Sequence, residues 1–110
     1  MLVRIPTEEV LVFFKMLDNT IQEKGVLYIG DGRIEVKGDK GKGVMVLGYF
    51  YQDIKFPPIE LTKEDIENLK KVYIDYLFTK YRYTDLIIVK YEKVDDVKFE
   101  FIFGNKWYVL

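Results

Sequence analysis

The segment TKEDIENLKKVYIDYLFTKY, residues 62–81, decides the fold because it is the longest stretch with one clear periodicity. At about 100° per residue, its large apolar side chains fall on one helical face. These side chains are Ile66, Leu69, Tyr73, Tyr76 and Leu77. Thr62 is a suitable N-cap, and Glu64 and Asp65 follow in the first turn, where acids complement the helix dipole. The pattern predicts a helix whose aromatic stripe packs against a sheet.

A second helix is predicted near the start of the chain, from Thr7 as its N-cap to about Lys24. Its apolar stripe consists of Val10, Phe13, Phe14, Leu17 and Ile21. Gly25 is the residue expected just after the helix, where glycine is favoured. The preceding residues 1–5 fit a short strand or a lead-in, which Pro6 ends.

The remaining segments have apolar residues at alternate positions and are separated by turn residues, as is typical of antiparallel hairpins. The predicted strands are residues 26–29, 33–37, 44–51, 85–94, 97–103 and 107–110. The 44–51 strand is apolar on both faces, so we expect it in the middle of a sheet. Residues 52–60 are expected to be a connection because they contain Pro57-Pro58.

Together these elements predict a single α+β domain over residues 1–110. It has a mainly antiparallel sheet and two helices, in the order α-β-β-β-α-β-β-β. A chain of 110 residues can bury one core without disulfide bonds.

Composition excludes several kinds of site. The chain has 17 basic and 18 acidic residues, mixed along its length, which argues against a nucleic-acid partner. It has neither cysteine nor histidine, so thiolate metal sites, cysteine nucleophiles and histidine bases are absent. We therefore expect no catalytic residue, no metal ligand and no cofactor. The first residues do not form a signal peptide and no apolar run could span a bilayer, so we expect a cytoplasmic protein without a membrane partner.

Glycine-rich and acidic segments have ordinary structural explanations. Residues 30–32 and 38–43 lead into strands rather than helices, which indicates hairpin turns instead of phosphate-binding loops. The alternative is a mobile basic loop containing Lys37, Lys40 and Lys42. Glu8-Glu9 suits a helix start and Asp95-Asp96 suits a turn, so neither pair indicates a catalytic site.

Aromatic residues are the one excess in the composition, with nine Tyr, eight Phe and one Trp. An AT-rich genome would raise Tyr and Phe together with Ile and Lys. The physical alternative is that strands 44–51 and 85–94 offer apolar side chains to a face that the helices leave open. That face would bind another protein or a second copy of this chain. We expect its anchors and rim charges to be Tyr49, Tyr51, Asp53, Tyr91, Glu92, Trp107 and Tyr108.

The second half of the chain resembles a known group of proteins. Its LTKED helix start at 61–65, followed by DLIIVKYE at 85–92 and KFEFIF at 98–103, is similar to the closing helix and hairpin of small bacterial immunity proteins. Those proteins neutralise polymorphic or contact-dependent toxins. The resemblance implies a non-catalytic inhibitor that blocks a cognate toxin, and it assigns no functional residue. The alternatives are a self-associating accessory protein from a virus or mobile element, an enzyme or small-ligand module that uses Tyr, Lys and carboxylates, and a nucleic-acid-binding domain.

Overall fold

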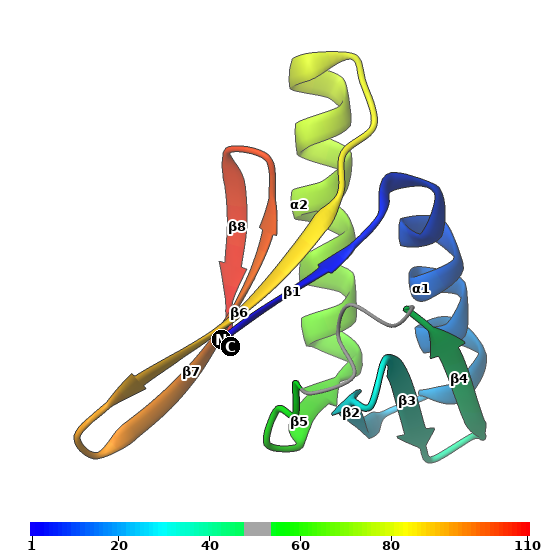
Figure 1. Cartoon of the computed structure of the whole chain (residues 1–110). Helices are drawn as coiled ribbons and strands as arrows, with labels where there is room; N and C mark the ends of the chain where they lie inside the picture. The colour runs from blue at the N-terminus through cyan, green and yellow to red at the C-terminus, as the bar shows by residue number, and fades with distance from the viewer. Residues whose placement is uncertain (48–53) are drawn as a thin grey trace. The chain divides into compact units, whose positions relative to one another are not determined.

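A computed structural model describes residues 1–47 and 54–110 (Figure 1). Its elements are β1 (Leu2–Ile5), α1 (Thr7–Thr20), β2 (Lys24–Gly30), β3 (Arg33–Gly38), β4 (Lys42–Val46), β5 (Ile59–Thr62), α2 (Lys63–Lys80), β6 (Leu86–Lys93), β7 (Asp96–Phe103) and β8 (Lys106–Val109). In the described part of the chain, the strands form sheet A, with order β1-β6-β7-β8, and sheet B, with order β4-β3-β2-β5. Every strand pairing is antiparallel. The predicted α+β class, with two helices and antiparallel strands, is confirmed.

The chain divides into two compact units. Unit 1 contains residues 1–10 and 67–110, and it holds sheet A and most of α2. Unit 2 contains residues 11–66, and it holds sheet B and most of α1. Unit 1 is assembled from both ends of the sequence because β1 pairs with β6, with Val3 opposite Ile88. The N-terminal segment is therefore a strand, not a lead-in.

A local capping box begins α2. The Asp65 N–H donates to Thr62 Oγ1 at 3.2 Å, and the Thr62 N–H donates to Asp65 Oδ2 at 2.8 Å. This reciprocal pair satisfies two backbone donors that a helix start would otherwise leave open. The predicted cap is confirmed, and most of the predicted stripe is buried: Ile66, Leu69, Tyr73 and Tyr76.

A carboxylate far along the sequence binds the first turn of α1. Thr7 is the first residue of the helix, and its N–H and hydroxyl both donate to Asp85 Oδ1, at 2.8 and 2.6 Å. Arg4 Nη1 donates to the other Asp85 oxygen at 3.0 Å. The hydroxyl of Thr7, its N–H and Arg4 hold the pKa of Asp85 below its ordinary value. The start of α1 therefore depends on Asp85 rather than on Thr7 alone.

The end of α1 lies at Thr20, four residues before the predicted end near Lys24. The Asp39 carboxylate accepts hydrogen bonds from the backbone N–H groups of Gln22, Glu23 and Lys24, at 2.7, 2.8 and 3.3 Å. A side-chain acceptor that takes these donors competes with continuation of the helix. Gly25 consequently lies within β2, opposite Gly38, and is not the residue after the helix. The 38–41 loop is anchored to the end of α1, where the Lys40 N–H donates to the Thr20 carbonyl at 3.0 Å.

The Asp39 carboxylate gives a pH-dependent prediction. The Gln22 N–H and its two neighbours lower the pKa of Asp39 below the usual 3.8. A pKa that is lower in the folded state contributes stability above the unfolded-state value, and this contribution is lost as the pH falls through the folded-state value. We expect Asp39→Asn to lower the thermal midpoint at pH 7, and the difference from wild type to shrink at about pH 3. Circular dichroism melts at both pH values measure this; a pH-independent difference would contradict it.

Sheet B differs from the sequence prediction at two strands. β5 lies where a connection was expected, and pairs with β2. Pro57 and Pro58 precede this strand, so they take no part in its ladder. β4 lies at the edge of sheet B in the part described, and its Val44 and Val46 are 58% and 78% exposed, so the expectation of a strand in the middle of a sheet is wrong there.

Candidate functional site

Sheet A has an inner face that α2 covers. Six side chains on this face have no exposed surface: Val3, Ile5, Leu86, Ile88, Phe101 and Phe103. The ring centroids of Tyr73, on α2, and Phe103 are 5.2 Å apart. Gly104 lies in the β7–β8 turn with a φ of +61°, a conformation that glycine adopts readily. The Tyr76 ring lies against it, in space that a Cβ would occupy. This face is the core of unit 1.

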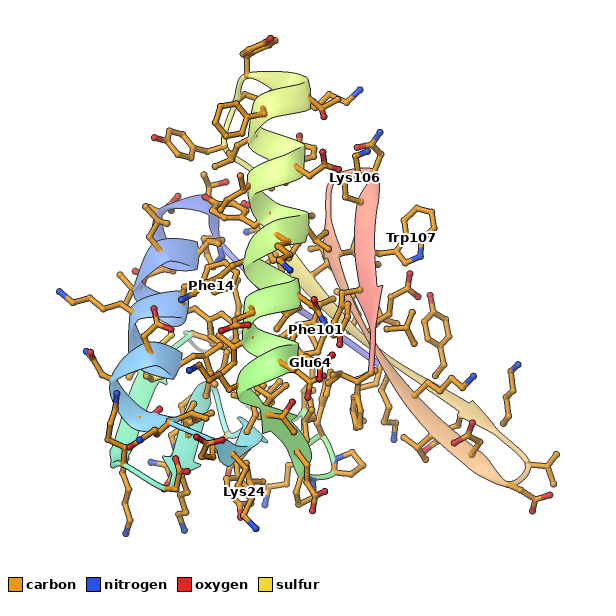
Figure 2. All side chains as sticks on the ribbon, turned by 180° about the vertical axis from the view of Figure 1, so that it is seen from behind. Phe14, Lys24, Glu64, Phe101, Lys106 and Trp107 are labelled. Carbon is orange, nitrogen blue, oxygen red and sulfur yellow. The ribbon has the colours of Figure 1, made fainter. Side chains whose placement is uncertain are left out.

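The opposite face of sheet A, called the outer face below, is mostly apolar. Strand register places its residues in two rows, which are Arg4, Ile87, Ile102, Trp107 and Leu2, Val89, Glu100, Val109. Tyr91 and Lys98 form a third, shorter row on the β6–β7 hairpin. Trp107 is 60% exposed, and Leu2, Tyr91 and Val109 are each about half exposed. Ile87, Val89 and Ile102, at the centre of the face, are half-buried. Figure 2 shows Trp107 pointing away from α2, so the exposed part of this face is available to a partner.

The charged residues of the outer face already have partners within unit 1. A hydrogen bond to the Glu100 carboxylate raises the pKa of the Tyr91 hydroxyl. Arg4 pairs with Asp85 at 3.0 Å, and Lys98 lies 4.0 Å from the Asp96 carboxylate. A protein that docks here would gain mainly by burying apolar side chains, each contributing about 1.5–3 kcal/mol when fully buried.

The β6–β7 hairpin extends beyond the strands on either side of it. The register of β1 with β6 ends at Val89, with one further hydrogen bond from the Lys90 N–H to the Met1 carbonyl. The register of β8 with β7 ends at Glu100, with one further hydrogen bond from the Leu110 N–H to the Phe99 carbonyl. Residues 91–98, called the hairpin arm, are all exposed, and Figure 1 shows them projecting past the ends of β1 and β8. A two-stranded hairpin with no further layer is only marginally stable in water. The arm therefore extends the outer face by a segment that a partner could stabilise.

The residues predicted to bind a partner do not all share this face. Tyr91 and Trp107 lie on the outer face. Glu92 and Tyr108 have the opposite orientation in their strands. Glu92 accepts from Lys90 Nζ at 2.6 Å, and the Tyr108 hydroxyl accepts from Asn68 Nδ2 of α2 at 3.4 Å. Tyr49, Tyr51 and Asp53 lie outside the described residues.

Sequence reasoning missed most of the aliphatic part of the outer face. The residues concerned are Leu2, Ile87, Val89, Ile102 and Val109. The available signal was the continuous apolar run at 86–89, which indicates a central strand with both faces apolar. Recognising residues 2–5 as the neighbouring strand would have placed Leu2 beside Val89.

Comparison with known proteins identifies no relative: no family model, curated protein or solved structure matches this chain. Within residues 1–47 and 54–110, no group of three or more acidic side chains could hold a metal ion. Neither helix of the described chain is long and apolar enough to cross a membrane. The outer face and the hairpin arm remain the features that best distinguish a candidate site.

Proposed function

We propose that this protein is a non-catalytic protein-binding module and that the outer face of sheet A, with the hairpin arm, is its docking surface. The observation that carries the proposal is the set of seven apolar side chains on the face opposite α2: Leu2, Ile87, Val89, Tyr91, Ile102, Trp107 and Val109. Aromatic anchors surrounded by smaller apolar contacts are typical of the energetic centre of protein interfaces.

We further propose that the partner is a toxin domain and that the protein acts in the cytoplasm as an immunity-type inhibitor. The resemblance of residues 61–65, 85–92 and 98–103 to small immunity proteins supports this choice. Inhibition would be steric, because docking of the outer face would cover the active site or substrate groove of the toxin. The competing partner is a second copy of this chain, bound through the same face.

A charge placed in the centre of the outer face tests the proposal. Val89 lies between Leu2 and Glu100 in its row, so Val89→Lys puts an ammonium group in the middle of the apolar surface while leaving Glu100 beside it. We expect partner binding to weaken by about a hundredfold and the free energy of unfolding to change by less than about 1 kcal/mol. The matched control is Val44→Lys, the same substitution on the exposed face of sheet B.

A two-hybrid screen against genomic fragments of the source organism provides the measurement. Interactors that are lost with Val89→Lys and retained with Val44→Lys support the docking surface. If such an interactor inhibits growth when produced alone, co-production of wild type should restore growth and co-production of Val89→Lys should not. Interactors indifferent to Val89→Lys would refute the docking surface. If the wild-type protein in solution has a mass near twice 13.1 kDa and Val89→Lys has half that mass, the partner of the outer face is a second copy of the chain and not a toxin.

A further inference from the structure

One edge of sheet A presents backbone groups that β7 does not use. The Leu110 N–H donates to the Phe99 carbonyl at 3.0 Å, and β8 continues in register with Tyr108 opposite Phe101. Hydrogen-bonded pairs alternate with non-bonded pairs along an antiparallel ladder. The N–H and C=O groups of Trp107 and Val109 therefore point away from β7. β8 is the last strand of sheet A in the part of the chain that the structure describes.

A hollow lies beside this edge, between β8 and α2. It has a volume of about 330 Å³ and is lined by Val72, Asp75, Asn105, Lys106 and Trp107. An ion pair of 3.2 Å between Lys106 Nζ and Asp75 Oδ2 holds β8 against the helix. A strand added to β8 would direct every second side chain toward α2, so one of them would enter this hollow.

The two β8 residues with outward-facing backbone groups, Trp107 and Val109, are neither proline nor charged, and the one charge of the strand, on Lys106, is paired with Asp75 of α2. Edge strands are commonly protected by proline, by charged side chains or by a covering element. Residues 107–109 are Trp, Tyr and Val, with no proline and no charge. Trp107 and Val109 also end the two rows of the outer face, so an added strand would continue these rows.

We propose that the partner adds an extended segment to the β8 edge, with one aliphatic side chain in the hollow beside Val72 and the alternate side chains extending the outer face. This inference rests on the proposed function and specifies how the partner binds. A second copy of β8 is the competing occupant, because antiparallel pairing would bring its own Lys106, Tyr108 or Leu110 to the same side as the hollow. A doubled mass of the wild-type chain that Val109→Pro returns to 13.1 kDa would overturn the inference in favour of that copy.

The edge can be blocked without disturbing the β7–β8 ladder. In Val109→Pro the lost N–H is one that points away from β7, and proline is tolerated at such edge positions. Val109→Ile is the matched control because it keeps both the N–H and the branched side chain. Val72→Phe fills the hollow and leaves the edge open. The probe is a library of random 12-residue peptides displayed on phage and selected against the full chain.

We expect selected peptides to bind Val109→Pro and Val72→Phe at least about tenfold more weakly than wild type, with Val109→Ile within about twofold. The Trp107 and Val109 amides should become protected from hydrogen exchange when a peptide binds to wild type. Selection of no peptide that protects these amides overturns the inference. Binding that Val89→Lys abolishes and Val109→Pro leaves unchanged also overturns it, while preserving the proposed function. Binding insensitive to both variants overturns the two proposals together.

Discussion

Replacement of Phe101 by alanine is expected to lower the free energy of unfolding by about 3–5 kcal/mol. The side chain is completely buried on the inner face of sheet A, between Ile88 and Tyr108 in the neighbouring strands. Truncation removes the whole phenyl ring from the core of unit 1 and leaves a cavity that the paired strands on either side cannot fill. Urea unfolding followed by circular dichroism measures the loss.

The matched variant is Trp107→Ala, which removes a larger ring from the other face of the same sheet. Because Trp107 is 60% exposed, we expect a change of less than about 1 kcal/mol. The comparison tests whether sheet A has one structural face and one available face. Equal losses from the two variants would show that Trp107 belongs to the core, and would remove the basis of the proposed docking surface.

A methyl group at position 38 is expected to destabilise unit 2 by about 3 kcal/mol, and so to lower its thermal midpoint by roughly 15 °C. A Cβ built on Gly38 collides with the carbonyl of Thr20, at the end of α1. The carbonyl group of Thr20 belongs to the backbone and cannot rotate away as a side chain could. Gly38→Ala must therefore displace α1 or the β3–β4 loop. Differential scanning calorimetry provides the midpoint.

Gly41→Ala is the control for the Gly38 prediction because it adds the same methyl group to the same loop. Its nearest neighbours would be the Asn19 carbonyl oxygen at 3.7 Å and Thr20 Cα at 4.0 Å, which are ordinary contacts. We expect its thermal midpoint to lie within a few degrees of wild type. Comparable losses from both variants would indicate that loop flexibility, rather than the contact with Thr20, causes the effect.

Local sequence signals predicted the elements whose determinants are themselves local. The α2 cap uses Thr62 and Asp65, three residues apart, so its hydrogen bonds could be anticipated from the sequence. The buried stripes of both helices follow their periodicity for the same reason. By contrast, the two boundaries of α1 depend on Asp85 and Asp39, which are distant in sequence. No window around the helix contains that information.

The candidate site was only partly predictable because a face is defined by strand neighbours. Composition indicated exposed aromatic residues, and Tyr91 and Trp107 both lie on the outer face, two rows apart. Glu92 and Tyr108 are adjacent to them in sequence and therefore point to the other side. β5 was missed because its four residues follow two prolines, and its partner is β2 on the far side of two turns. The face on which a side chain lies and the presence of β5 both depend on which strands pair, and this pairing joins residues that are distant in sequence.

The bond between Asp85 and Thr7 has a consequence for how the chain folds as it leaves the ribosome. Unit 2 is one continuous segment, so its strands can pair once residue 66 has been translated and released. Unit 1 must wait, because β1 remains without its neighbour β6 and the first turn of α1 remains without its carboxylate until residues 85–89 emerge. Residues 1–10 are thus synthesised well before residues 85–89, and they are among the last to reach their native contacts.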